Sequence, residues 1–452
     1  MVMVCADVDR VRMTGAPIER IDSHVDVVGR RGRVATKTAD GISWSIDGAL
    51  GNLVGVRTRD PLPHLDYDAF ARDLDAIRAE AVASIGPDDL THLKKLERWG
   101  RACEAFGYAT AWVAPNPVSA VAIALGSTAR WTIVTHHVTH GGMDRVPGAP
   151  LHYTSKGFAK GQRRLLDWFD WIHPDAWHYE HNVLHHYRTN EAADPDLVEQ
   201  NFAGLEGASP AVRYAAAAFF ALTWKWSYYA PNTWQVLRRT EREKASGRPV
   251  SVDGIANPEP LLDAFDPRTS EGRSFWRACL LPYGLTRFVA LPAAFLPLGP
   301  WAAFSVWANS VGAEFVANLH SFLVITPNHA GDDMHRFDRK VSDRAEFYVR
   351  QVLGSVNFST GGDLRDFLHG FLNYQIEHHL WPDLPPAVYQ RIQPKVKAVC
   401  ERHGVPYVQE PLYKRVRQLL GVMVGTRKML RSETRSRNER RGERPQEHVS
   451  AE

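Results

Sequence analysis

The chain has 452 residues, which is enough for one large domain or for two to three ordinary ones. Its formal net charge of +3 is close to neutral, so the composition predicts no nucleic-acid partner. The cysteines are far apart and form no Cys-x-x-Cys pair, which excludes a disulfide framework and a thiolate zinc site: Cys5, Cys103, Cys279 and Cys400.

The N-terminal part of the chain is predicted to contain an arm and a helical region. Residues 1–45 mix charged, glycine and small residues, and this mixture predicts a flexible arm. Residues 46–104 contain two stretches with apolar residues at helical spacing, with Pro and Asp near their starts. We therefore expect an amphipathic helical region before the first apolar segment.

Three later segments are candidates for membrane helices. Residues 105–129 and 288–313 carry no charge, and residues 214–237 carry only Lys225, which could extend toward an interface. Each segment is close to the ~20 residues that cross a hydrocarbon layer of ~30 Å. These segments predict membrane insertion, with buried core helices as the alternative.

The number of crossings is constrained if the histidine groups described below share one side of a membrane. Residues 211–231 and 298–325 then give two crossings, whereas residues 278–296 lie along the interface. Residues 105–135 are one span or a shallow hairpin. We expect a mainly α protein with about three to four spans plus interfacial helices.

The C-terminal segment 426–452 is predicted to be a disordered, basic tail. Residues 427–444 carry eight Lys or Arg against three Glu, with almost no apolar residues. Basic charge favours the cytoplasmic face of a membrane. Removal of residues 430–452 is expected to matter little.

Nine of the twenty histidines fall in three dense groups, which together predict a shared metal site: His136, His137 and His140; His178, His181, His185 and His186; His378 and His379. Histidines four residues apart share a helix face, whereas adjacent ones point about 100° apart. Doubled histidines therefore cannot easily bind one ion from one helix, but they can reach two. Gln375 lies one turn before the last pair and can hydrogen-bond within the site.

The kind of metal follows from the ligand type. Imidazole suits Zn, Cu, Fe and Ni, but eight or more imidazoles are too many for a structural zinc site. Soluble di-iron proteins use Glu-x-x-His pairs, and this motif is absent from the sequence. A pair of irons bound by histidines is the better fit, and bis-histidine haem is a weaker alternative.

Three motifs resemble the histidine boxes of membrane fatty acyl desaturases: His136-x-x-x-His140, His181-x-x-x-His185-His186 and Gln375-x-x-His378-His379. The third box, within "LNYQIEHHLWPDLP", resembles the front-end subgroup, and so does the following "VYQRIQPKVKAVCERHGVPY". The resemblance covers roughly residues 105–420. It implies a membrane helical bundle that carries a cytosolic helical cap with two Fe²⁺ ions, and a desaturase domain over residues 105–425.

The resemblance also implies roles for single residues. The implied metal ligands are His136, His140, His181, His185, His186, His329, His378 and His379. His329 takes this role because "TPNHAGDD" resembles the element that supplies a further histidine, with Asn328 beside it and His320 as the fallback. The first box leaves open whether His136 or His137 is the ligand. Gln375, His137, His320 and Asn328 are otherwise supporting residues.

The function that the resemblance implies is oxygen-dependent insertion of a cis double bond into a long acyl chain. The substrate is carried as acyl-CoA, on acyl-carrier protein or in a lipid, and O₂ is the co-substrate. The sequence shows no fused haem-binding motif, so the expected electron donor is a separate ferredoxin or b-type cytochrome with its reductase. The protein is expected in the membrane with its active site on the cytoplasmic side. The alternatives are an acyl hydroxylase and, more distantly, a non-redox metal- or haem-binding membrane protein.

Overall fold

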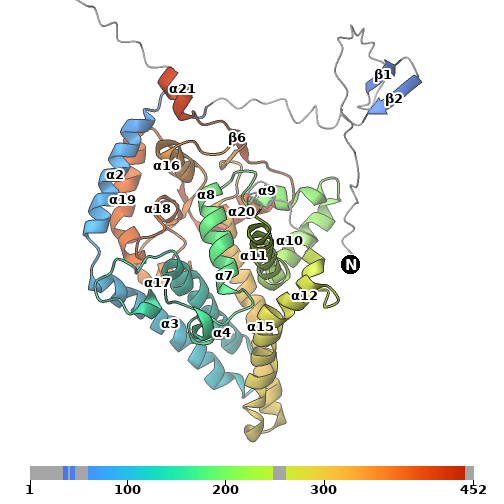
Figure 1. Ribbon diagram of the computed structural model, residues 1–452. Coiled ribbons are helices and arrows are strands. Elements are labelled where there is room, and N and C mark those ends of the chain that lie inside the picture. The colour runs from blue at the N-terminus through green and yellow to red at the C-terminus, as the bar shows by residue number, and fades with distance from the viewer. Residues whose placement is uncertain (1–33, 39–40, 46–59, 248–260, 443–452) are drawn as a thin grey trace, which may run out of the picture. The chain divides into compact units, whose positions relative to one another are not determined.

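The computed structural model describes residues 34–38, 41–45, 60–247 and 261–442 (Figure 1). The chain divides into two units, Met1–Arg57 and Thr58–Glu452.

The first unit contains a β-hairpin. Strand β1 (Val34–Thr38) pairs antiparallel with β2 (Gly41–Ser45). The flexible arm predicted for residues 1–45 did not include a hairpin, and the rest of that arm lies outside the described residues.

The second unit is mainly helical and begins with the amphipathic pair α2 (Tyr67–Ala83) and α3 (Pro87–Ala111). The Asp66 side chain caps α2 by accepting a hydrogen bond from the Ala69 amide at 2.9 Å. The buried face of α2 packs against α19 (Pro386–His403). These two helices are those expected in the N-terminal helical region.

The next helices form a hairpin with α3. The apolar segment 105–129 is not one continuous helix, because prolines and the cap residue Asn116 separate α3 from α4 (Pro117–Ala129). Asn309 of α15 (Pro300–Ile325) fixes this turn, since its Oδ1 accepts from the Asn116 amide at 2.8 Å. A helical run continues from α4 through the π-helical segment η1 (Arg130–Thr135) into α5 (His136–Thr139).

Short elements follow the first histidine group and include the second one: η2 (Leu151–Tyr153), η3 (Gly161–Arg163), α6 (Arg164–Asp167), α7 (Pro174–Trp177), the π-helical η4 (His178–His185), α8 (His186–Arg188), α9 (Val198–Asn201) and η5 (Ala203–Leu205). A second long helical run follows, built from α10 (Pro210–Trp224), the π-helical η6 (Lys225–Tyr229) and α11 (Ala230–Ala245). Lys225 in this run is buried and forms an ion pair with Asp170, so its side chain does not extend toward an interface as the sequence suggested.

A third helical run precedes α15 and contains η8 (Leu261–Ala264), α12 (Ser270–Phe275), η9 (Trp276–Leu280), α13 (Leu281–Leu285), η10 (Thr286–Ala290), α14 (Leu291–Ala293) and η11 (Leu296–Leu298). Gly299, at a φ of 107°, breaks the apolar segment 288–313 before α15 begins. By length and composition, two described helical runs could cross a membrane: Pro117–Thr139 and Ser270–Leu298. The interfacial position of residues 278–296 stays a prediction.

The C-terminal part of the second unit contains η12 (Thr326–Asn328), α16 (Arg344–Leu353), α17 (Asp363–Leu368), α18 (Gln375–Leu380), α19 and α20 (Leu412–Met423). Two short parallel strand pairs join distant segments: β3 (His335–Phe337) with β6 (Leu430–Ser432), and β4 (Asn357–Phe358) with β5 (Gln409–Glu410).

The tail departs from the prediction of disorder as far as α21 (Arg437–Gly442). Strand β6 pairs with β3, and Thr434 is buried beside the charged groups of Glu346 and Arg350. Basic residues that look solvated in the sequence have acidic partners from distant segments, and these partners order the segment. Residues 443–452 of the predicted tail lie outside the described part of the chain.

Candidate metal centre

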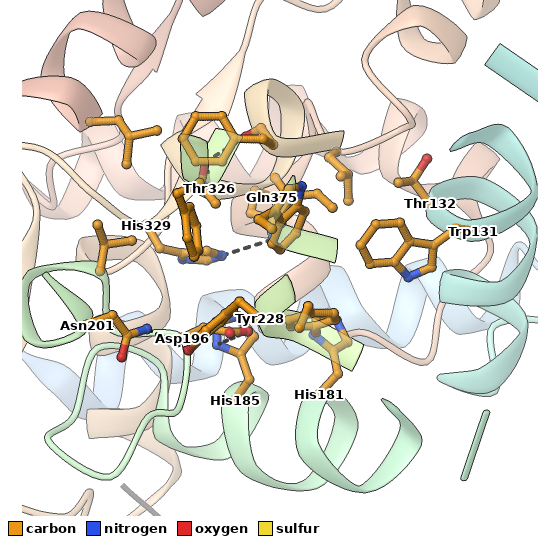
Figure 2. Close-up of a pocket in the computed structure, with 18 of the residues that line it drawn as sticks. Trp131, Thr132, His181, His185, Asp196, Asn201, Tyr228, Thr326, His329 and Gln375 are labelled. Atoms are coloured by element: carbon orange, nitrogen blue, oxygen red, sulfur yellow. Dashed lines mark hydrogen bonds and ion pairs between the residues drawn. The ribbon is translucent and has the colours of Figure 1, made fainter. Parts of the chain in front are cut away.

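The three histidine groups and His329 come together from four places in the chain. They lie on the helical run that ends in α5, on η4 and α8, directly after η12, and on α18. Figure 2 shows His181, His185, His329 and Gln375 around one cavity.

The first cluster, which we call cluster A, contains His136, His140, His181, His186 and His378, with one ring nitrogen of each within 4.8 Å of the others. The Nε2 atoms of His136 and His181 are 3.0 Å apart, and those of His186 and His378 are 3.2 Å apart. Nitrogens at such separations can bind one ion through bonds of about 2.1 Å. The first box therefore contributes His136 rather than His137 to cluster A.

The second cluster, cluster B, contains His185, His329 and His379, again with one nitrogen of each within 4.8 Å of the others. The Gln375 amide donates from Nε2 to Nε2 of His329 at 3.0 Å. Gln375 thus lies within the site, at the position expected from its spacing.

The doubled histidines divide between the two clusters. His186 and His378 belong to cluster A, whereas their neighbours His185 and His379 belong to cluster B. This division follows from helix geometry, in which adjacent side chains point about 100° apart. The clusters adjoin, because the rings of His186 and His379 stack with centroids 4.2 Å apart.

Each ring of cluster B has an acceptor for its outer nitrogen: the Asp194 Oδ1 atom for His185 at 2.9 Å, the Gly354 carbonyl for His329 at 3.0 Å and the Gln351 Oε1 atom for His379 at 3.1 Å. Such bonds fix the tautomer and direct the opposite nitrogen inward. These acceptor residues were not predicted from the sequence. Only Asp194, in the "ADPD" stretch after the second box, follows a histidine group closely enough to have been suspected.

Burial keeps most of the clustered rings neutral. It lowers the pKa of each of four histidines well below the usual value, and the neighbouring rings add to this effect: His181, His186, His378 and His379. Burial also lowers the pKa of His329, to about 3. Neutral imidazole is the form that binds a metal ion, so these rings are ready to act as ligands at neutral pH.

His185 differs in its electrostatics. Burial alone would lower its pKa, but the Asp194 carboxylate outweighs that effect through its charge and hydrogen bond, with a smaller contribution from Asp196, so the pKa is raised. Asp196 joins His181 and His185 in a third group with metal-ligand spacing. Burial raises the pKa of the Asp196 carboxyl to about 7.

The donor set fits one or two transition-metal ions. Nε2 of His140 and Nε2 of His379 are buried and have no hydrogen-bond partner among residues 60–247 and 261–442. Buried polar atoms without partners are costly, and an ion bound in each cluster would satisfy them. The ligands are imidazoles, which suit iron, copper, nickel and zinc.

Three other candidates and one further histidine, His369, lie outside the two clusters. His137 donates a hydrogen bond from Nδ1 to the Ile133 carbonyl oxygen of its own helical run at 2.8 Å. His320, the fallback for His329, lies 2.7 Å from the Leu368 carbonyl oxygen. The remaining two, Asn328 and His369, also hydrogen-bond to backbone carbonyls.

A mainly apolar cavity lies against both clusters, with His136 and His181 of cluster A and His185 and His329 of cluster B in its wall. Much of the remaining wall is apolar or aromatic: Trp131, Phe220, Trp224, Tyr229, Phe322 and Leu372. In Figure 2, Trp131 and Thr132 lie at one end and Asp196 and Asn201 at the other, with His181 between them.

A helical protein that holds two imidazole clusters against an apolar cavity is suited to metal-dependent chemistry on an apolar substrate. The comparison with family models is more specific. Residues 110–411 match the model described as fatty acid desaturase, which is more than half of the chain, so the protein belongs to the fatty acid desaturase family. It is an oxidoreductase that desaturates fatty acyl chains.

Similar curated proteins are desaturases. A "NADPH-dependent stearoyl-CoA 9-desaturase" of Mycobacterium tuberculosis is 26% identical over 370 residues, which cover 77% of this chain and 78% of the relative. An "Acyl-lipid (7-3)-desaturase, chloroplastic" of Chlamydomonas reinhardtii is 27% identical over 351 residues, 74% of this chain and 61% of the relative. A "Delta(8)-fatty-acid desaturase" of Euglena gracilis is 34% identical over 95 residues, 21% of this chain and 22% of the relative. No solved structure matches the chain.

Proposed function

We propose that the protein inserts a cis double bond into a long-chain acyl substrate at two histidine-bound iron ions, with O₂ as co-substrate. One observation carries the proposal: two adjoining imidazole clusters form part of the wall of one apolar cavity. Desaturation is an oxidation, and zinc has no redox chemistry, so iron is the better of the metals that suit imidazole.

The proposed ligands divide between the clusters, with cluster A around one ion and cluster B around the other: His136, His140, His181, His186 and His378; His185, His329 and His379. When bound, the ions supply the redox chemistry that removes hydrogens from two adjacent methylenes. Gln375 lies beside cluster B, within hydrogen-bond distance of the His329 Nε2 atom that would face the ion.

The protein itself positions the substrate and excludes water. Apolar walls such as those of Phe322 and Leu372 favour methylenes over water, and they restrict which carbons can lie beside the histidines. Asp194 and Gln351 hold two cluster B rings in fixed orientations. The oxidising power itself belongs to the cofactor.

We also propose that the protein is integral to a membrane, with the site on the cytoplasmic side and three to four spans within a desaturase domain over residues 105–425. The two candidate helical runs support insertion. So do large apolar side chains that are exposed on α10, on the run up to residue 298 and on α15: Phe219, Leu285, Val289, Trp301, Phe304 and Trp307. The family match supports the domain boundaries.

The reaction needs an electron donor as well as an acyl carrier. Reducing O₂ to two waters takes four electrons, and forming a double bond supplies two, so a ferredoxin or a b-type cytochrome with its reductase supplies the other two. The candidate carriers are CoA, acyl-carrier protein and lipid, since one named relative acts on stearoyl-CoA and another on acyl-lipid.

The first experiment is expression in a host that supplies ferredoxin, followed by mass spectrometry of total fatty acids. A new unsaturated acid is expected with the intact protein and with the control His369→Ala, whose ring lies outside both clusters. It should be absent with His379→Ala. Equal product from His379→Ala would contradict the ligand assignment, and a hydroxylated product would move the assignment to an acyl hydroxylase.

Metal analysis of the purified protein tests the cofactor separately. About two irons per chain, one for each cluster, are expected without haem absorption. Haem, or zinc alone after reconstitution with iron, would overturn the di-iron proposal.

A further inference from the structure

One end of the cavity, which we call the closed end, is lined by packed and buried aromatic rings. Trp131, Trp224 and Tyr229 are each 3% exposed, and all three line the cavity. The Trp131 ring centroid lies 5.6 Å from that of Trp224 and 5.8 Å from that of Tyr229. The opposite end, by contrast, includes the exposed residue Asn201 (Figure 2).

A buried ion pair lies behind the closed end. Lys225 Nζ is 2.5 Å from Asp170 Oδ2, and the two side chains are 2% and 3% exposed. The same ammonium lies 4.9 Å from the centroid of the Trp131 ring, within cation–π range. Lys225 and Asp170 are not among the residues that line the cavity, so they act on its contents through neighbouring residues, of which Trp131 contacts the ammonium.

The backbone around Lys225 is also fixed. Asn318 of α15 accepts a hydrogen bond from the Lys225 amide at 2.9 Å, and its carbonyl accepts one from the Trp224 indole at 3.0 Å. Lys225 is the first residue of the π-helical segment η6, a local geometry that often occurs at functional sites. A buried charge pair costs desolvation energy, so this one is poor evidence for a purely stabilising role.

We propose that Trp131 limits how far an acyl chain extends past the metal centre, and that the Lys225–Asp170 pair positions the Trp131 indole. This inference rests on the proposed function, because it takes the cavity to hold the acyl chain. The exposed end near Asn201 accommodates the carrier, and the methyl end of the chain meets Trp131. Trp131 is thus a specificity residue, whereas Lys225 and Asp170 are positioning residues.

The expected effect is a change in chain-length selectivity rather than in total activity alone. One methylene too many in an apolar pocket costs roughly 10- to 200-fold in selectivity. Trp131→Ala opens the closed end of the cavity. The variant should therefore lose selectivity of about this size against the next longer acyl chains. Products from such chains, or a double bond closer to the carboxyl end, are the expected signature.

The test supplies saturated fatty acids of increasing length to cells that express each variant, and measures product ratios by mass spectrometry. Ratios do not depend on the amount of folded enzyme. Trp131→Phe provides a milder change if Trp131→Ala does not fold. Trp226→Phe is the control, because Trp226 follows Lys225 in η6 but does not line the cavity. Unchanged length selectivity and bond position in a Trp131 variant that makes product would overturn the proposal.

The ion pair is tested by removing both charges together, since Lys225→Met alone leaves a buried carboxylate without its partner. The double variant Lys225→Met/Asp170→Asn should shift product ratios in the same direction as Trp131→Ala, by a smaller factor. Wild-type ratios in this variant would overturn the positioning role.

A separate variant distinguishes failure of this inference from failure of the proposed function. Phe322→Trp adds bulk to the cavity wall and should lower turnover of every chain length at least tenfold if acyl chains occupy the cavity. Normal turnover by Phe322→Trp would refute the assignment of the cavity itself. Reduced turnover by Phe322→Trp, combined with unchanged ratios in the Trp131 variants, would refute only the role of the closed end.

Discussion

Individual side chains outside the two clusters determine how the histidine rings are oriented. The Asp194 carboxylate accepts hydrogen bonds from His185 Nδ1 at 2.9 Å and from the backbone amides of Asn190 and Asp196 at 2.8 and 2.9 Å. It is 2% exposed, so these partners replace its hydration. One carboxylate therefore fixes both a ring and the loop that follows the second box.

Replacing Asp194 by Asn should weaken metal binding. The amide of Asp194→Asn is neutral and can present its NH₂ group to the ring, which loosens the tautomer and orientation of His185. Loss of such a partner typically lowers metal affinity 10- to 100-fold. Iron content after titration with a chelator measures the effect. Asp175→Asn, which removes an exposed ion pair with Lys160, is the control, and equal iron retention in both variants would contradict the assignment.

Helices α3 and α4 pack closely, and this packing helps to position the metal centre. A Cβ atom at Gly126 would lie 2.6 Å from the Glu104 Cβ and 2.7 Å from the Gly100 carbonyl oxygen. Small residues at such a crossing allow two helix backbones to pack directly. Because α4 continues through η1 into α5, this interface also determines where His136 and His140 lie.

Gly126→Ala should therefore destabilise the protein. Overpacking a tight interface costs about 1–3 kcal/mol. The midpoint of thermal unfolding in detergent should fall, whereas Gly204→Ala, where an added Cβ meets nothing within 4 Å, should leave it nearly unchanged. An equal midpoint for both variants would show that α3 and α4 tolerate a wider separation.

Helix α16 depends on a buried carboxylate, and its stability should depend on pH. Burial alone would raise the pKa of Glu346, but the Arg350 guanidinium outweighs it, with hydrogen bonds from Ser342 and Thr434, so the pKa is lowered. The stabilisation is complete above the unfolded value of about 4.3 and is lost as pH falls through the lowered folded pKa. The difference in unfolding midpoint between wild type and Glu346→Gln should be constant near neutral pH and shrink below about pH 4. A difference independent of pH would contradict the assignment.

Across the whole molecule, local patterns were predictable from the sequence and distant partners were not. Histidine spacing predicted the division of His185 and His186 between two clusters, because helix geometry acts within one turn. Lys225 was misread because its partner Asp170 lies 55 residues away. The basic tail was misread for the same reason, since Arg435 pairs with Asp60 from the other end of the second unit. Composition alone cannot distinguish a solvated charge from one whose partner is distant.

Because part of the tail is ordered, we expect its removal to destabilise the protein. Ending the chain after Arg427 deletes strand β6 and the buried Met429, and removes the Thr434 hydroxyl that bridges Arg350 and Glu346. Hydrogen bonds to charged groups contribute about 1.5–3 kcal/mol each, so a loss of about 3 kcal/mol or more is expected.

Thermal unfolding of two truncated proteins checks this expectation. A chain that ends at Gly442 keeps every described contact of the tail and serves as the comparison for the chain that ends at Arg427. The shorter chain should unfold at a clearly lower temperature and accumulate less in cells, because the β3–β6 pairing joins the end of the chain to the segment just after His329. Equal stability of the two proteins would contradict this expectation and support the disordered tail that the composition suggests.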